Sequence, residues 1–365
     1  MRALILGDIC PKINYDDFKN KRTDMLFGDF LPVMQGSDFT FVNLECAITD
    51  SETEIKKFGP ALRAPRELAE VIAELGVTVC GMSNNHSFDY GIRGAIDSIS
   101  ALTDAGVDYT GFGDNYENSR KNYYYEKDGE RICVIAVCEH EFSGALENRM
   151  GARTFEYDTF GDIVDAKRNA DRVIVCYHGG KEYSVFPSPR LRMVCRNMVK
   201  CGADIVLCQH SHCIGCYEEY QDSHILYGQG NFHFIFSSDN KRKEETDSSL
   251  AVFYDTKTGA IEFIPLRVEG RGIKIAEGAY CEKILGDFYK RNEYLQNGKW
   301  REEWKKFCNN ISHQYVEWVG KAGRSESSEK DNVLFAQILK CEAHNDVLGE
   351  AFHTWNDTNE LERKK

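Results

Sequence analysis

Hydrophobic residues in the first third of this chain form short runs that end in polar side chains. Three such runs, at residues 3–6, 38–42 and 77–82, are rich in aliphatic and aromatic residues. Short apolar runs bounded by Gly or polar residues are typical of buried strands. After the third run, apolar residues recur with helical spacing from Ile92 to Leu102. Strands that alternate with helices in this way predict an α/β fold.

A second series of strands is predicted in the middle of the chain. The expected strands cover residues 131–138, 172–177, 203–207 and 225–227. Ser188 and Pro189 have the residue types preferred at the N-cap and first position of a helix, which is predicted to extend to Lys200. Residues 250–254 and 261–266 are predicted to form a closing hairpin. The charged segment 238–248 is predicted to be an exposed loop.

The composition of the chain changes near Gly278. From there onward the sequence lacks strand patterns and is rich in charged and aromatic residues. We therefore expect a helical C-terminal extension over residues 278–365, packed beside the mouth of the site, and a functional domain over residues 1–270. A chain of 365 residues is long enough for one large domain with such an appendage.

Charge and cysteine content narrow the class of protein. A formal net charge of −13 disfavours nucleic acid or an anionic membrane surface as the main partner. The 14 cysteines are scattered, mostly inside apolar runs, where free cysteine behaves as a small hydrophobic residue. No run approaches the ~20 apolar residues of a membrane span, and the N-terminus lacks the apolar core of a signal peptide. We therefore expect a soluble, cytoplasmic protein.

Residues that can bind metal follow the predicted strands. They are Asp8, Glu45, Asn85, His86, His178, His210 and His212. Open α/β sheets bind ligands at the carboxyl ends of their strands, so these side chains are expected on a common rim. Carboxylate, amide and imidazole groups together suit one or two divalent ions, with Mn, Zn or Fe favoured over Ca. Two adjacent ions would activate water and stabilise the oxygens of a displacement reaction.

The stretch from Ser83 to Gly91 combines several of these groups. His86 follows Asn85 directly, so it could lie at the rim as the general acid for the leaving group. Asp89 could orient the other nitrogen of His86. The alternative is a helix cap rich in Asn and Asp with a hydrogen-bonded loop histidine. Similar residues at four other strand ends favour the functional interpretation.

Six separated motifs within roughly residues 1–270 resemble one known family. The motifs are Asp8, Asn43–Glu45, Asn84–His86 with Asp89 and Gly91, His178–Tyr183, His210–His212 and Gly230–Phe232. Their residues and order resemble the CapA-type capsule synthesis (poly-γ-glutamate biosynthesis) family, a branch of the calcineurin-like metallophosphoesterases. The resemblance implies a four-layer α/β/β/α sandwich of the metallophosphoesterase type, to which the helical extension is added.

The resemblance also implies roles for residues within these motifs. His86 takes the place of the superfamily's catalytic histidine. The implied metal ligands are Asp8, Glu45, Asn85, His178, His210 and His212. The residues predicted to contact substrate are Asn43, Glu182 and Asn231. The implied activity is metal-dependent hydrolysis of a phosphoester, polyglutamate or glycan, linked to a capsule or poly-γ-glutamate type polymer.

Three positions depart from the family pattern. The superfamily usually has a histidine two residues after its first aspartate, and this chain has Cys10, for which packing is favoured over metal binding. Glu45 stands where the wider superfamily has a bridging aspartate, so its longer side chain would change the metal spacing. Gly179 replaces a common tryptophan, which would widen or reshape the substrate wall.

Two alternatives remain open from the sequence. Cys213 and Cys216 have the spacing of zinc ligands, but a second pair is missing, so two ordinary cysteines after a strand are favoured. The other alternative is a non-catalytic accessory or binding protein of envelope-polymer synthesis, with the same fold and a degenerate metal site. His86 beside Asn85 favours the enzyme, because a merely structural metal ion would not need it.

Overall fold

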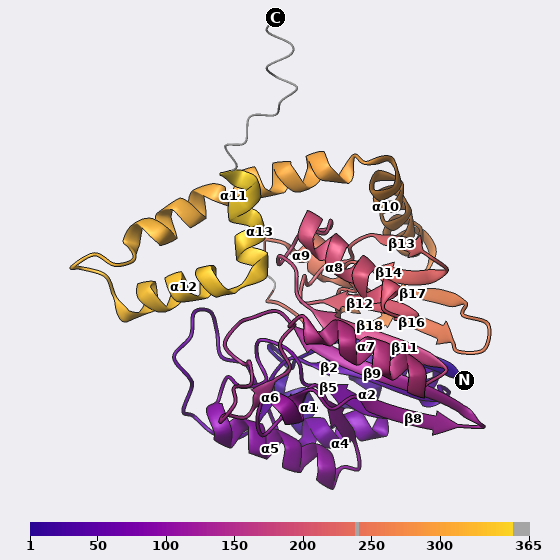
Figure 1. The fold of residues 1–365 in the computed structure, drawn as a ribbon. Coiled ribbons are helices and arrows are strands. Elements are labelled where there is room, and N and C mark those ends of the chain that lie inside the picture. Colours follow the sequence, from indigo (N-terminus) through magenta and orange to yellow (C-terminus); the bar gives the residue numbers. More distant parts are fainter. Residues whose placement is uncertain (238–240, 353–365) are drawn as a thin grey trace, which may run out of the picture.

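The buried strands pair into two mixed β-sheets that lie face to face (Figure 1). A computed structural model describes residues 1–237 and 241–352 of the chain. Side chains of both sheets, among them Ile5 of the first and Val134 of the second, share one buried apolar cluster. Helices cover the outer face of each sheet. The four stacked layers confirm the predicted α/β/β/α fold class.

Alternation along the strands explains how each sheet serves two layers. Successive side chains of a strand point to opposite faces. Ile5 therefore lies between the sheets, whereas Leu4 and Leu6 pack under the outer helices. In the second sheet, Val134 faces the first sheet and Ile135 faces the outer helices. Because both faces are buried, these strands are recognised in the sequence as continuous apolar runs.

The first sheet contains eight strands. In spatial order seven of them are β18 (Gly272–Ile275), β17 (Ile261–Glu269), β16 (Ser248–Asp255), β1 (Arg2–Ile9), β2 (Phe39–Leu44), β5 (Val79–Gly81) and β6 (Asp108–Thr110), and β15 (Asn231–His233) also pairs with β1. From β1 to β6 the strands are parallel. The antiparallel β16–β17 pair confirms the predicted hairpin.

The second sheet contains six strands, and two further pairs lie outside the main sheets. In spatial order its strands are β13 (Tyr217–Tyr220), β14 (Ser223–Leu226), β12 (Ile205–Gln209), β11 (Arg172–His178), β9 (Glu130–Cys138) and β8 (Tyr123–Lys127). The small pairs are β3 (Ala47–Ile48) with β4 (Arg63–Ala64) and β7 (Phe112–Gly113) with β10 (Gly151–Ala152). The four central strands are parallel, so their carboxyl ends share one edge.

Helices follow the strands as the pattern predicted. The helices before the C-terminal segment are α1 (Tyr15–Lys19), α2 (Thr23–Phe27), the 3-10 helix η1 (Gly28–Phe30), α3 (Leu31–Gln35), α4 (Glu67–Glu74), α5 (Gly91–Asp104), α6 (Tyr116–Ser119), α7 (Asp158–Asn169), α8 (Pro189–Lys200) and α9 (Lys243–Thr246). Helix α8 matches its expected limits. The Ser188 hydroxyl accepts a hydrogen bond from the Leu191 amide, and Pro189 occupies the first position.

The C-terminal segment is helical over its described residues, 278–352. Its helices are α10 (Gly278–Asn297), α11 (Trp300–Lys321), α12 (Glu329–Lys340) and α13 (Glu342–Ala351). Ile284 and Phe288 of α10 join the cluster between the sheets. Helices α11 to α13 form an arch beside the sandwich around a small core of their own (Figure 1). Residues 353–365 of the predicted extension lie outside the described residues, and the domain division near residues 270–278 stays a prediction.

Two local predictions were wrong. The charged segment 238–248 is not simply a loop, because it contains α9 and the first residue of β16, and Thr246 is buried; residues 238–240 lie outside the described residues. Asp8 lies within β1, not after it, because β1 is paired there on both sides, with Asn43 of β2 and Asn231 of β15. Within the described ranges, no helix is both long and apolar enough to span a membrane.

Candidate metal centre

Side chains from both sheets meet at the carboxyl ends of the parallel strands. Asp8 in β1, Glu45 after β2 and Asn85 after β5 come from the first sheet. His178 ends β11, and His210 and His212 follow β12 in the second sheet. All six predicted ligands are at most 9% exposed. Their convergence follows from the topology, because the parallel strands of both sheets end on the same side of the sandwich.

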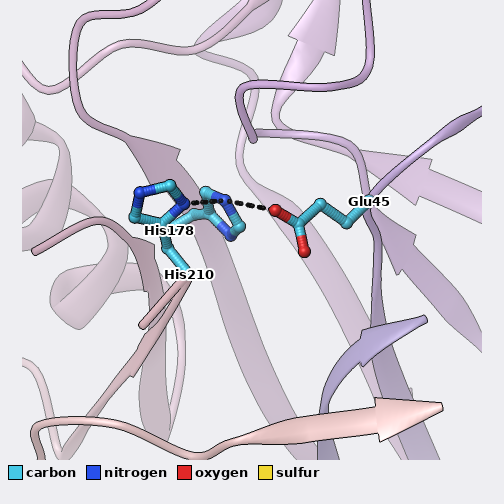
Figure 2. A group of neighbouring side chains, drawn as sticks. All are labelled: Glu45, His178 and His210. Carbon is cyan, nitrogen blue, oxygen red and sulfur yellow. Dashed lines mark hydrogen bonds and ion pairs between the residues drawn. The ribbon is translucent and has the colours of Figure 1, made fainter. Parts of the chain in front are cut away.

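The ligand atoms form two overlapping groups. Glu45, His178 and His210 make one group, shown in Figure 2, and Asp8, Glu45 and His212 make the other; within each, the candidate ligand atoms lie within 4.8 Å of one another. Glu45 belongs to both groups, so it would be a ligand common to both if each group held an ion. The use of the residues of both groups as metal ligands stays a prediction.

His178 lies close to the other residues of the first group. Its Nε2 atom lies 3.3 Å from Glu45 Oε1, 3.1 Å from His210 Nδ1 and 3.0 Å from Asn85 Oδ1. Burial lowers the pKa of His178, but the carboxylates of Glu45 and Asp8 outweigh that effect and raise it to about 10. The surrounding groups therefore favour a positive charge at this position.

The Glu45 carboxylate supplies an independent test of whether a metal fits. Glu45 is fully buried, and neither of its oxygens has a hydrogen-bond partner among the described residues. A buried carboxylate is costly unless a positive charge balances it; the protonated His178 ring, 3.3 Å from Glu45 Oε1, can supply that charge, and a divalent ion held by the same residues would take over this role. Imidazole nitrogens and carboxylate oxygens suit Zn, Mn or Fe. The residues present therefore fit one or two divalent ions.

Neighbouring amides hold the ligands in place. Asn43 donates a 2.7 Å hydrogen bond to Asp8 Oδ1, and the other Asp8 oxygen accepts from the His210 backbone amide at 3.1 Å. The Asn231 carboxamide oxygen lies 2.9 Å from His212 Nδ1, which leaves Nε2 of His212 for an ion. Such contacts orient metal ligands. Asn43 and Asn231 thus contact the proposed ligands, and their contact with substrate stays a prediction.

The loop after β12 has an uncommon backbone. His210 and His212 adopt φ angles of +83° and +57°, in the left-handed region that few residues other than Gly occupy. Residues held in such conformations cluster at functional sites. The left-handed turns position both imidazoles within one short loop. This feature supports a functional role for the loop and has no signal in the sequence.

His86 lies outside both ligand groups and is paired with Asp89. Its Nδ1 atom lies 2.6 Å from Asp89 Oδ2. Lys57, which the sequence analysis missed, binds the other oxygen of Asp89, and its side chain is only 4% exposed. Burial, together with the nearby Lys57 ammonium, lowers the pKa of His86 despite the opposing effect of Asp89. Lys57 belongs to a charged stretch that resembles an exposed loop, so the sequence held no sign of its burial.

The structure describes the surroundings of two of the sequence departures, Gly179 and Cys10, and of the alternative zinc pair. A Cβ atom at Gly179 would lie 2.6 Å from Glu139 Cγ, so the side chain of Glu139 occupies the space beside Gly179; that the substrate wall is widened or reshaped there stays a prediction. Cys10 lies in the core between the first sheet and its helices. Within the described residues, neither candidate metal group includes Cys10, Cys213 or Cys216. The alternative zinc site therefore has no support among these residues.

Two further acidic residues border the centre. Glu141, also missed in the sequence, lies with Oε1 3.6 Å from His210 Nε2. Burial raises the pKa of Glu141 to about 7, against the opposing effect of Lys57. Glu182, predicted to contact substrate, is partly exposed and lies 3.6 Å from the Lys181 ammonium. The substrate contact of Glu182 stays a prediction.

The fold and the site together define a four-layer α/β protein with a carboxylate and histidine centre at its strand ends. The family described as bacterial capsule synthesis protein PGA_cap matches residues 2–236, and the chain belongs to this family. This result confirms the family resemblance derived from the six motifs.

Curated relatives agree with this family. "Capsule biosynthesis protein CapA" of Bacillus anthracis is 29% identical over 280 residues, which cover 73% of this chain and 67% of the relative. "PGA biosynthesis protein CapA" of Bacillus subtilis is 27% identical over 324 residues, which cover 85% of this chain and 81% of the relative. A protein of Mycobacterium tuberculosis named "Probable polyglutamine synthesis accessory protein" is 25% identical over 265 residues, with coverage of 66% and 70%.

Proposed function

We propose that this protein is a metal-dependent hydrolase that acts in the metabolism of a capsule or poly-γ-glutamate type polymer. The observation that carries the proposal is the Glu45 carboxylate, which is fully buried, forms no hydrogen bond with the described residues, faces the His178 ring at 3.3 Å and belongs to both candidate ligand groups. A buried charge of this kind is retained where a cation balances it. Family membership and the names of the relatives support the link to a polymer.

The proposal gives each group a role. The metal-binding set is Asp8, Glu45, Asn85, His178, His210 and His212. Divalent ions held there would supply Lewis-acid activation of water and charge stabilisation at the reacting group. His86 would donate a proton to the leaving group, while Asp89 holds its Nδ1 atom. Lys57 would fix Asp89 in turn.

A cavity beside the centre provides room for a substrate. It has a volume of about 930 Å³ and is lined by residues that include Phe88, Glu141, Phe142 and Arg149. Phe88 belongs to the loop that carries His86, and Glu141 faces His210. The cavity therefore approaches the centre through these neighbours of His86 and His210, although no proposed metal ligand is among the residues that line it. Its size falls within the range of sites that bind small molecules or short segments of a chain.

The second candidate is a non-catalytic accessory protein with a metal site of structural importance only. The observation in its favour is the name of the Mycobacterium tuberculosis relative, "Probable polyglutamine synthesis accessory protein". The hydrogen-bonded set of Lys57, Asp89 and His86 favours the enzyme, because none of the three belongs to either ligand group.

Two measurements on the full chain separate these candidates. Elemental analysis of protein purified without chelator is expected to find one or two divalent ions, and Glu45→Gln is expected to lose most of them. The metal-loaded protein is then assayed on bis(p-nitrophenyl) phosphate, p-nitrophenyl phosphate and poly-γ-glutamate. Turnover of at least one substrate supports the hydrolase. Metal-loaded protein that turns over none of them supports the accessory protein.

A further inference from the structure

We propose that Glu141 and Gln337 are positioning residues through which the C-terminal helices orient His210 at the metal centre. The inference rests on the proposed metal centre, and it concerns residues to which neither the sequence motifs nor the family match assigns a role. Two contacts carry it: one from His210 to Glu141, the other from Glu141 to α12.

The first contact involves the nitrogen of His210 that points away from the ligands. Nδ1 of His210 lies 3.1 Å from His178 Nε2 and faces the ligand group. Nε2 lies on the other side of the ring, 3.6 Å from Glu141 Oε1. When one nitrogen of an imidazole binds a metal ion, the other carries a proton and needs an acceptor that fixes the tautomer and the ring orientation. The 3.6 Å separation is longer than a hydrogen bond, and the inference is that Glu141 becomes that acceptor when His210 binds an ion.

The second contact links Glu141 to the C-terminal helices. Gln337 on α12 donates a 2.7 Å hydrogen bond from Nε2 to Glu141 Oε2. Gln337 is only 9% exposed, although it belongs to a helix whose outer face is solvated. The bond leaves the second oxygen of Glu141 directed at His210. The two oxygens of one carboxylate therefore join α12 to a proposed metal ligand.

The neighbours of Glu141 are held by the same helices. His140 donates from its backbone amide to Glu342 Oε2 at 2.8 Å, and its Nδ1 atom lies 2.7 Å from Glu342 Oε1. Arg190 binds both Glu139 and Asp346 of α13. Three successive residues after β9 are thus each joined, directly or through Arg190, to α12 or α13. The segment that carries Glu141 is therefore attached to the C-terminal helices at three successive residues.

The contact with α12 is a feature of this chain's C-terminal segment. The family match ends at residue 236, and Gln337 lies about one hundred residues beyond it. The C-terminal helices therefore contribute to a centre whose other parts all lie within the family match. Loss of a partner that orients a metal ligand typically costs ~10–100-fold in metal affinity.

The test measures Mn²⁺ affinity of the metal-free, full-length protein by isothermal titration calorimetry. Glu141→Leu is expected to weaken binding by ~10–100-fold. Glu141→Gln keeps a neutral acceptor and should recover part of that loss, and Gln337→Met should cause a smaller loss than Glu141→Leu. The matched controls are Glu126→Gln on β8 and Gln314→Met on α11. Both positions are exposed, so these variants should bind Mn²⁺ with the affinity of the wild type. Circular dichroism identifies any variant that fails to fold.

A double variant tests whether Gln337 acts through Glu141. If it does, adding Gln337→Met to Glu141→Leu costs no further affinity, because the shared contact is already lost. If Gln337→Met lowers the Mn²⁺ affinity by the same factor in the wild type and in Glu141→Leu, the inference is overturned. So would wild-type affinity in Glu141→Leu when the wild type binds Mn²⁺. If the wild type itself binds no divalent ion, the proposed function fails and the inference falls with it, a result distinct from the other two.

Discussion

Replacement of His86 by alanine should separate catalysis from metal binding. His86 lies beside Asn85 in the chain, yet only Asn85 reaches the proposed ligands, with Oδ1 3.0 Å from His178 Nε2. His86 is instead held by Asp89 at 2.6 Å. We therefore expect His86→Ala to lower turnover and to keep most of the bound metal, whereas Asn85→Ala should weaken metal binding as well.

The magnitude follows from what the substitution leaves behind. General acid catalysis typically contributes ~10²–10⁴-fold in rate, which corresponds to about 3–5.5 kcal/mol of transition-state stabilisation. Asp89 keeps its contacts with Lys57 and with the Leu62 amide at 2.7 Å after His86 is removed. No buried carboxylate is left unpaired, so the fold and the ligand groups should survive. The loss should therefore appear in kcat and not in metal content.

The assay combines metal analysis with steady-state kinetics on an activated phosphodiester. His313→Ala, at an exposed position on α11, is the matched control and should behave as the wild type does. Supply of a better leaving group, which needs less protonation, should restore part of the activity of His86→Ala. If His86→Ala loses the metal, His86 is a ligand and the proposed separation of roles is refuted.

Three further predictions concern the surroundings of the site. Gly179→Ala should lower the free energy of unfolding by ~1–3 kcal/mol, measured by urea denaturation, because the added Cβ would lie 2.6 Å from a neighbouring side chain. Lys57→Met should lower it by ~3–5 kcal/mol, since Asp89 would lose its buried cation; an unchanged urea midpoint would contradict this. The hydrogen bond to Glu342 raises the pKa of His140 to about 9, above its unfolded value near ~6.5. The stability that this pair contributes should be fully present below pH ~6.5 and lost as the pH rises through about 9, a decline that His140→Gln should flatten.

The sequence predicted the strands correctly where burial on both faces produces a continuous run of apolar residues. Strands buried on both faces are recognised as apolar runs, and the residues that follow them meet wherever parallel strands share an edge. Asp8, His178 and His210 could therefore be predicted to converge. The six motifs, which keep their order along the chain, supported the family resemblance, and that resemblance in turn implied the layer arrangement.

Contacts that join distant segments could not be predicted. Glu141 and Gln337 are 196 residues apart in the chain, and no local pattern relates them. Lys57 looked exposed because its neighbours are charged, yet it is buried against Asp89. The sequence also does not show that the side chain of Glu139 lies directly beside Gly179. Each of these features depends on tertiary packing between elements whose own patterns are unremarkable.

The pairing of β16 with β1 means that the part of the chain that carries the motifs is smaller than the part that must fold. The family match ends at residue 236, but β16, β17 and β18 follow it and form one side of the first sheet. A protein truncated at the end of the match would expose the hydrogen-bonding edge of β1 along Arg2–Ile5, where β16 pairs. Unpaired edges of this kind recruit other strands and lead to aggregation. Expression of the motif-bearing part alone should therefore yield insoluble protein, even though every proposed ligand is present in it.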